Sequence, residues 1–135
     1  MGLFDFLKPK SNNGQFVSEK AFKSNLDNQM QMTPQTLHQL RKINVTAEKE
    51  LKLEYFFYTN TAEKAEKLAN EIGKLNYTVQ HGTSASDKKL FIVTGWTTKM
   101  KMSDDVVSDW TQQMCEIGNK FDCEFDGWGT QPDQD

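Results

Sequence analysis

The sequence predicts an α+β fold: a ferredoxin-like βαββαβ sandwich in which a four-stranded antiparallel sheet carries two helices on one face, preceded by a helical N-terminal extension. Two observations lead to this class. Segments rich in aromatic and β-branched residues alternate with polar segments whose apolar residues recur at helical spacing. Along the chain, these segments follow one another as strand, helix, strand, strand, helix, strand.

The composition divides the chain into three parts. Residues 1–44 are expected to form a partly helical or flexible extension, residues 45–132 the ferredoxin-like domain, and residues 133–135 a tail. The extension contains a passage typical of a linker, because Lys8 to Gly14 combines Pro, Asn and Gly, which disfavour regular structure.

A helix is predicted near the end of the extension. Between Phe16 and Met32 apolar residues are sparse, and their spacing permits only a marginal helix. Thr33 followed by Pro34 is a better start signal, because Thr caps helices and Pro favours the first helical position. A short helix is therefore expected from this point to about Ile43.

The first half of the domain is predicted as strand, helix and strand. Leu51 to Tyr58 is rich in aromatic residues and is typical of a strand. Asn60 follows as a helix cap, with Glu63 three residues later as in a capping box. The apolar positions of this helix are Ala62, Ala65, Leu68, Ala69 and Ile72. A second short strand is expected from Tyr77 to Gln80 or His81.

The second half begins with a polar loop from Gly82 to Asp87 and a third strand from Lys89 to Trp96. Ser103 caps the second helix, and Asp104 and Asp105 occupy its first turn, where the helix dipole favours anions. The apolar positions of this helix are Val106, Val107, Trp110, Met114 and Ile117.

The last strand, from Phe121 to Phe125, alternates apolar and acidic residues. Side chains alternate along a strand, so one face carries Phe121, Cys123 and Phe125, and the other carries Asp122, Glu124 and Asp126. Gly127 indicates a bulge or turn, since glycine adopts positive φ without strain. Such a bulge would return Trp128 to the core face, where it is expected to be largely buried.

Composition limits the classes of function. With 135 residues, a net charge of -3 and an isoelectric point near 5.4, the chain has no basic footprint for nucleic-acid binding, so direct RNA binding is not expected. Cys115 and Cys123 lack metal-ligand spacing and are expected to be reduced, which predicts a cytoplasmic protein. The apolar stretch at the N-terminus is too short to predict a signal peptide or membrane anchor.

The three carboxylates of the last strand are the only group close enough to suggest catalysis. They could hold a metal or form an acid-base pair, but a solvated strand face is the simpler interpretation. His38 and His81 fall in different elements, and the sequence has no phosphate loop or catalytic triad. We therefore predict no catalytic, cofactor-binding or metal-binding residues and no enzymatic activity.

Aromatic residues are expected on both faces of the sheet. Tyr55 and Phe57 face one way, and the residues facing the other way include Phe56, Tyr58, Ile92 and Trp96. Since two helices cover one face, the second face is covered by the extension or by self-association, bound by a protein partner, or used to stack RNA bases. The third strand lacks the motif of RNA-recognition domains and the net charge is negative, which weakens the RNA alternative.

The closing segment resembles that of a known family. Its residues are Phe121, Asp122, Glu124, Phe125, Asp126, Gly127 and Trp128. They resemble the Phe-Asp-x-Glu-Tyr/Phe-Asp-Gly-Trp segment of the regulator of ribonuclease E activity B family, and a weaker similarity extends from about Leu53 to Thr130. The resemblance implies a protein without chemistry of its own that binds the scaffold of ribonuclease E. The chain departs from the family in its N-terminal extension and in lacking a long acidic C-terminal tail.

Two classes of function stay open. The first is a regulatory or adaptor protein whose partner binds an acidic surface formed by Asp104, Asp105, Asp109, Asp122, Glu124 and Asp126. The second is a small-molecule-binding or enzymatic ferredoxin-like domain with an aromatic pocket. A flat acidic surface favours the first class, and a buried pocket with titratable groups favours the second.

Overall fold

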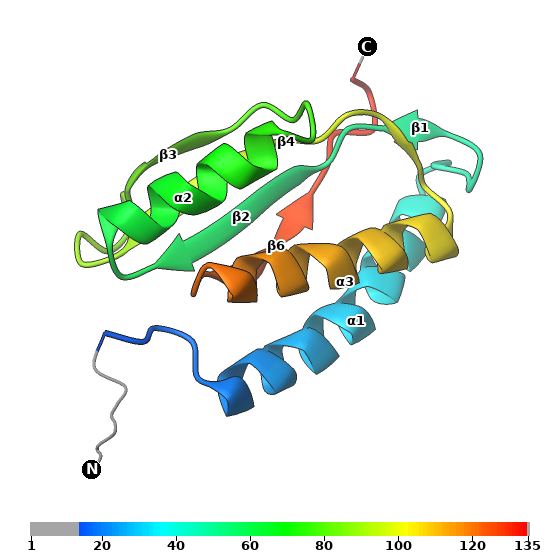
Figure 1. The fold of residues 1–135 in the computed structure, drawn as a ribbon. Helices are drawn as coiled ribbons and strands as arrows, with labels where there is room; N and C mark the ends of the chain where they lie inside the picture. Colours follow the sequence, from blue (N-terminus) through cyan, green and yellow to red (C-terminus); the bar gives the residue numbers. More distant parts are fainter. Residues whose placement is uncertain (1–13, 135) are drawn as a thin grey trace.

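The computed structural model describes residues 14–134, and within them the predicted α+β fold is confirmed (Figure 1). The main sheet has four antiparallel strands in the order β3-β4-β2-β6, the ferredoxin-like arrangement, and a second sheet pairs β1 with β5. The elements are α1 (Glu19–Arg41), β1 (Glu50–Leu51), β2 (Glu54–Thr59), α2 (Ala62–Gly73), β3 (Gln80–Thr83), β4 (Phe91–Trp96), β5 (Met100–Lys101), α3 (Asp104–Lys120) and β6 (Glu124–Gly129). Except for Gly14, the predicted linker lies outside the described residues.

The core lies between the main sheet and its helices. Tyr55 and Phe57 of β2 are completely buried, and Phe57 pairs with Val93 of β4 on one side and with Phe125 of β6 on the other. Gly95 lies on the same side of β4, where an added Cβ would stand 1.9 Å from the Thr78 carbonyl oxygen. This close approach of two backbone segments therefore requires glycine at that position.

All four predicted strands have boundaries that differ from the observed ones, and the third begins at Phe91 instead of Lys89. The strand expected from Leu51 to Tyr58 is two strands, because Leu51 pairs with Met100 in the small sheet while β2 begins at Glu54. The strand expected from Tyr77 to His81 begins only at Gln80 and continues through Gly82 and Thr83, because these residues pair with β4. The last strand begins at Glu124, three residues later than predicted.

Of the two helix caps predicted in the domain, one is correct and the other lies one residue later. Ser103 caps α3 by accepting a hydrogen bond from the Val106 N–H, as predicted. The cap of α2 is Thr61 instead of Asn60, and its hydroxyl accepts from the Lys64 N–H. The Asn60 side-chain oxygen instead accepts from the Lys64 ammonium at 2.9 Å.

The N-terminal helix is longer than predicted. It is a single helix that begins after the Ser18 cap and continues past Pro34, so the predicted start at Thr33 is wrong. Thr33 is buried, and its hydroxyl is hydrogen-bonded to the Thr111 hydroxyl of α3 at 2.8 Å instead of capping a helix. Packing against α3 therefore outweighs the local start signal at Thr33. It also outweighs the cost of the backbone hydrogen bond that is lost at Pro34, which has no N–H.

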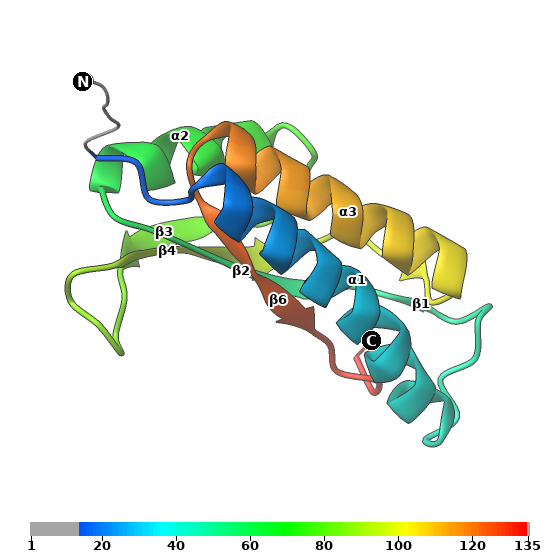
Figure 2. The ribbon, with the colours of Figure 1, turned by 90° about the horizontal axis from the view of Figure 1, so that it is seen from below.

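Helix α1 lies alongside α3 and runs in the opposite direction, next to the β6 edge of the sheet (Figures 1 and 2). Two side-chain amides connect it to that edge: Asn25 donates to the Phe125 carbonyl oxygen at 2.8 Å and Gln29 donates to the same oxygen at 3.5 Å. Strand β6 forms one edge of the main sheet. The helix shields this edge from pairing with a further strand.

The predicted bulge in the last strand is confirmed. Phe57 pairs with Phe125 but Phe56 pairs with Gly127, so Asp126 is an extra residue on β6, and Gly127 has a φ of 135°. Trp128 returns to the helical side of the sheet, opposite Tyr55. It is partly buried there, with its ring 6.4 Å from that of Trp110 and its indole N–H donating to the Thr33 hydroxyl at 3.0 Å.

We expect Trp128→Ala to lower the free energy of unfolding by about 3 kcal/mol, because it removes a large ring from the junction of α1, α3 and β6. Trp128→Phe keeps most of the packing and loses the hydrogen bond to Thr33, so it should cost about 1 to 2 kcal/mol. Urea denaturation of both variants measures the two effects. Equal stability of the parent and the alanine variant would contradict the structural role of Trp128.

Candidate functional site

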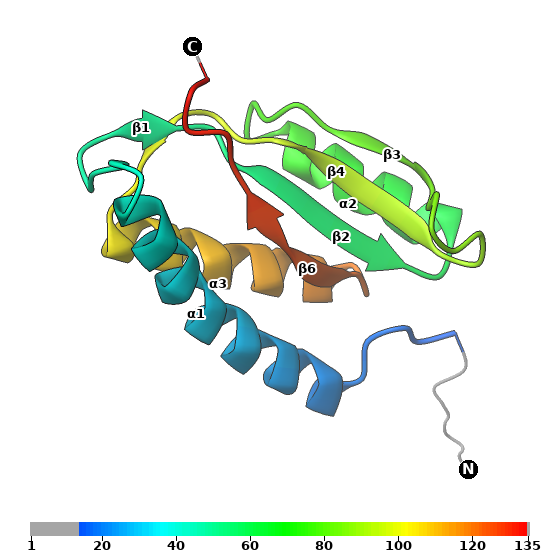
Figure 3. The same cartoon turned by 180° about the vertical axis from the view of Figure 1, so that it is seen from behind.

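One face of the main sheet carries no helix. Seen from behind, the strands lie in front of α2 and α3, and no described helix passes over β2 and β4 (Figure 3). We call this surface the open sheet face; its strand positions are Glu54, Phe56, Tyr58, Ile92, Thr94, Trp96, Glu124 and Asp126, together with Gln80 and Gly82 of β3. Helix α1 therefore covers an edge of the sheet, and among residues 14–134 nothing helical covers this face.

The four apolar residues predicted on the second face are all on the open sheet face. The residues of β2 that alternate with them are completely buried on the other side, which confirms the predicted alternation. Phe56, Tyr58, Ile92 and Trp96 are partly exposed. Phe56 pairs with Thr94 on one side and with Gly127 on the other, where Asp126 is the extra residue of the bulge.

Carboxylates accompany these aromatic rings. Glu54 pairs directly with Trp96, and Glu124 pairs directly with Tyr58, so each carboxylate lies next to an aromatic side chain on the adjacent strand. Burial and the nearby Asp126 carboxylate raise the pKa of Glu124, and burial raises the pKa of Asp126. None of the strand positions that define this face is Lys or Arg, so its carboxylates have no cationic neighbour within it.

The six acidic residues predicted as one binding surface are divided between separate places. Asp104, Asp105 and Asp109 lie in the first turns of α3, whereas Asp122 follows the other end of this 17-residue helix, about 25 Å away. Asp104 also forms an ion pair with Arg41 at 3.0 Å. Only Glu124 and Asp126 are on the sheet.

Asp122 does not lie on the outer side of the last strand. It occupies a turn with a φ of 58°, and its carboxylate faces the N-terminal segment. The two oxygens accept hydrogen bonds from the Phe16 N–H at 2.7 Å and the Val17 N–H at 2.8 Å, and one also pairs with the Lys64 ammonium at 2.6 Å. We call this arrangement the Asp122 clamp. It holds the segment before α1 against the N-terminal end of α2.

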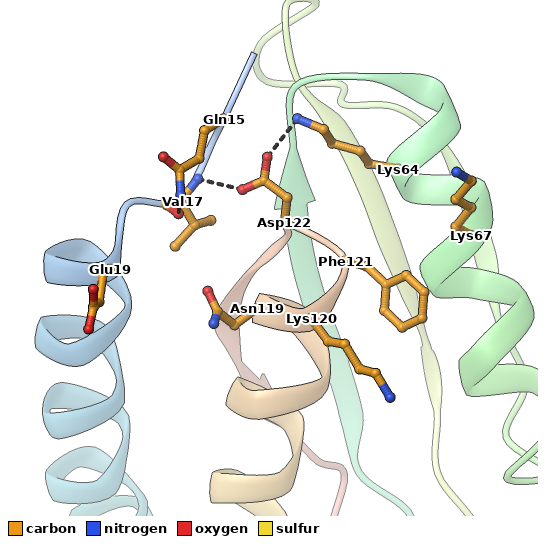
Figure 4. A pocket seen from close by; sticks show the side chains of 9 residues that line it. All are labelled: Gln15, Val17, Glu19, Lys64, Lys67, Asn119, Lys120, Phe121 and Asp122. Carbon is orange, nitrogen blue, oxygen red and sulfur yellow. Dashed lines mark hydrogen bonds and ion pairs between the residues drawn. The ribbon is translucent and has the colours of Figure 1, made fainter. Parts of the chain in front are cut away.

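Burial alone would raise the pKa of Asp122, but the Lys64 ammonium and the N–H groups of Val17 and Phe16 lower it below its ordinary value. An open pocket surrounds the clamp (Figure 4), and its lining residues are Gln15, Val17, Glu19, Lys64, Lys67, Asn119, Lys120, Phe121 and Asp122. The charged groups at its centre are already paired with one another. The pocket is therefore explained by the docking of the N-terminal segment.

The remaining candidate groups do not form a reactive centre. Cys115 and Cys123 are buried, and burial raises the pKa of their thiols to about 12 and about 11, respectively, so both stay protonated at neutral pH. The expected inward orientation of Cys123 is confirmed. Over residues 14–134, no three His, Cys, Asp or Glu side chains come together in a way that could hold a metal ion.

No helix in the described part of the chain has the length and apolar character needed to cross a bilayer.

Sequence reasoning missed two residues that the structure makes important. Glu54 was not included in the second face, although it shares the parity of Phe56 and Tyr58 on one strand and could have been placed there by counting. Lys64 was not recognised as the partner of Asp122, and no local signal relates two residues that are 58 positions apart.

Comparison with known families shows a match to the model described as regulator of ribonuclease activity B over residues 30–130. The match begins within α1 and extends past the end of β6, so it includes every strand and helix that forms the sandwich. No curated protein sequence matches the chain.

We expect Asp122→Ala to lower the free energy of unfolding by about 2 to 3 kcal/mol, because it removes charge-assisted hydrogen bonds and leaves alanine at positive φ. Asp122→Asn tolerates that φ and retains one acceptor, so it should cost about 1 kcal/mol. Because the pKa of Asp122 is lowered on folding, the stabilisation is present above about pH 4 and is lost as the pH falls through the lowered pKa. Urea titrations at pH 7 and pH 3 measure this difference.

We expect Glu124→Gln to stabilise the protein at pH 7, because the folded state raises the pKa of Glu124 and so disfavours its charged form. Solvent screening keeps the gain small, at about 0.5 kcal/mol. The gain should disappear near pH 3, below the unfolded pKa, where Glu124 is protonated in both the folded and the unfolded state. Thermal melts at the two pH values test this, with Glu66→Gln, an exposed carboxylate on α2, as the matched control. A Glu124→Gln variant less stable than the parent at pH 7 would show that the charge is well accommodated.

Proposed function

The chain belongs to the regulator of ribonuclease activity B family, and we propose that it regulates a ribonuclease by binding protein, without chemistry of its own. The resemblance of its closing segment favours a ribonuclease of the E type, or the RNA-degrading assembly built on such an enzyme, as the partner. The place of action that we propose is the cytoplasm, where RNA degradation by such an assembly occurs.

The open sheet face is the observation that supports binding of a protein. It brings Phe56, Tyr58, Ile92 and Trp96 together on a continuous surface next to three carboxylates. Aromatic side chains are enriched in protein interfaces and dominate their energetics. A core composed of aromatic residues with a polar rim is the composition expected of a surface that binds another protein.

The other classes of function fit this surface less well. An enzymatic or small-molecule-binding domain would need an enclosed pocket, whereas Phe56, Tyr58 and Trp96 lie on an open face and the hollow lined by Tyr77 and Trp110 is open to solvent. The groups of the Asp122 clamp are paired with one another. Binding of RNA through the face would bring phosphates towards Glu54, Glu124 and Asp126, which repel them. Our proposal therefore includes no direct contact with RNA.

The test is a capture experiment with the purified protein as bait in a lysate of its source, with and without ribonuclease A treatment. We expect a ribonuclease to be retained after the treatment, and the purified protein to change the rate at which that ribonuclease cleaves a fluorogenic RNA. The double variant Tyr58→Ala/Trp96→Ala should weaken binding of the ribonuclease by at least about 30-fold, because each truncation of a central interface aromatic costs about 1 to 2 kcal/mol.

The matched control is the double variant Ile43→Ala/Leu75→Ala, which removes two exposed apolar side chains away from the open sheet face. It should bind and regulate as the parent does. Capture that depends on RNA, or an unchanged rate of cleavage in the presence of saturating protein, would contradict the proposal. Circular dichroism of each variant verifies that the fold is retained.

A further inference from the structure

The two pairs of aromatic and acidic residues on the open sheet face have a defined geometry. Glu54 and Trp96 are direct neighbours across β2 and β4, and Tyr58 and Glu124 are direct neighbours across β2 and β6. Their Cβ atoms are therefore about 5 Å apart within each pair. Each pair therefore places an aromatic side chain next to a carboxylate.

An arginine side chain fits each of these pairs. Its planar guanidinium stacks on an aromatic ring and donates two parallel hydrogen bonds to a carboxylate. The ammonium group of lysine is compact and strongly hydrated, and lacks both the planar stacking and the bidentate geometry. The pairs thus favour arginine over lysine.

The distance between the pairs sets the spacing of the two arginines. Glu54 and Tyr58 are four residues apart on β2, which corresponds to about 13 Å along the strand. The pairs lie on opposite sides of β2, which adds one strand separation of about 4.8 Å across the sheet and gives a diagonal of about 14 Å. An extended chain spans this distance with residues i and i+4, whose side chains point to the same side.

The position between the two pairs is apolar. Phe56 lies midway between the two pairs on β2, and its side chain is partly exposed on the open sheet face. Residue i+2 of an extended segment would be directed at this ring. An aliphatic side chain at that position would bury apolar surface against Phe56.

Building on the proposed function, we propose that the open sheet face recognises an extended segment of its partner with the pattern Arg-x-Leu-x-Arg, one arginine between Trp96 and Glu54 and the other between Tyr58 and Glu124. Charge complementarity selects this occupant. A second copy of the chain would place the same carboxylates opposite one another, and RNA would place phosphates there, so both arrangements are repulsive.

The test uses synthetic 11-residue peptides, acetylated and amidated, with Arg-Thr-Leu-Thr-Arg at the centre and Gly, Ser and Thr elsewhere. Titration into the isotopically labelled protein is followed by NMR. We expect shifts of the Glu54, Trp96 and Glu124 amides, and an affinity at least five-fold higher than for peptides with Lys-Thr-Leu-Thr-Lys or with the two arginines only two residues apart. Equal affinities for the three peptides would overturn the proposal.

Single charge removals assign each arginine to its pair. Glu54→Gln should reduce the affinity for the arginine peptide about five-fold. In this variant, replacing the peptide arginine that binds Glu54 by citrulline should have no further effect. Glu124→Gln should likewise remove the effect of replacing the other arginine. The matched control Glu66→Gln removes an equal charge from α2 and should leave the affinity unchanged. If Glu54→Gln and Glu124→Gln bind the peptide as the parent does, the assigned pairs are wrong.

The captured ribonuclease separates this inference from the proposed function. Loss of its binding in the Tyr58→Ala/Trp96→Ala variant, together with full binding in a Glu54→Gln/Glu124→Gln variant, would overturn the arginine recognition and leave the regulatory function intact. Selective binding of the arginine peptide without any effect on ribonuclease activity would support the recognition and contradict the function. A dimer that dissociates when Trp96 is replaced by alanine, measured by analytical ultracentrifugation, would overturn the choice of occupant.

Discussion

The β-bulge at Asp126 places two consecutive large aromatic residues of β6 on the helical side of the sheet. Phe125 and Trp128 are separated by two residues, and strict alternation would direct them to opposite faces. With the extra residue, both rings make edge contacts with Trp110 of α3, at 5.9 Å and 6.4 Å. The Trp128 indole then bonds to Thr33, so the bulge determines where α1 docks.

The position of α1 in turn leaves the second face of the sheet without a covering helix among residues 14–134. Because its contacts are made with α3 and with the edge of β6, the helix does not extend over β2 and β4. Asp122, in the turn before β6, and Glu124, the first residue of β6, have opposite roles. Asp122 is fully engaged by Lys64 and two backbone N–H groups, which lower its pKa, whereas Glu124 is partly buried beside another carboxylate, which raises its pKa.

The sequence predicted those parts of the fold that depend on local patterns. The alternation in β2 and β4 placed the aromatic residues on the correct faces, and Gly127 located the bulge, because period and glycine conformation are local properties. The start signal at Thr33 and Pro34 failed because contacts with α3, distant in sequence, decide the extent of α1. Whether the N-terminal extension covers the second face could not be predicted, since this depends on the same distant contacts. The division of the chain at residue 44 stays a prediction.

The Asp122 clamp joins the two ends of the described chain. Its carboxylate accepts a hydrogen bond from the N–H of Phe16, which is 106 residues away in the sequence. Loop closure over such a separation is slow compared with formation of a local hairpin or helix. During synthesis, the segment before α1 emerges from the ribosome first and has no acceptor until almost the whole chain is translated. Docking of this segment is therefore a late event in biogenesis. In a truncated polypeptide that ends before β6, the side of α1 that normally contacts β6 is exposed to chaperones and proteases.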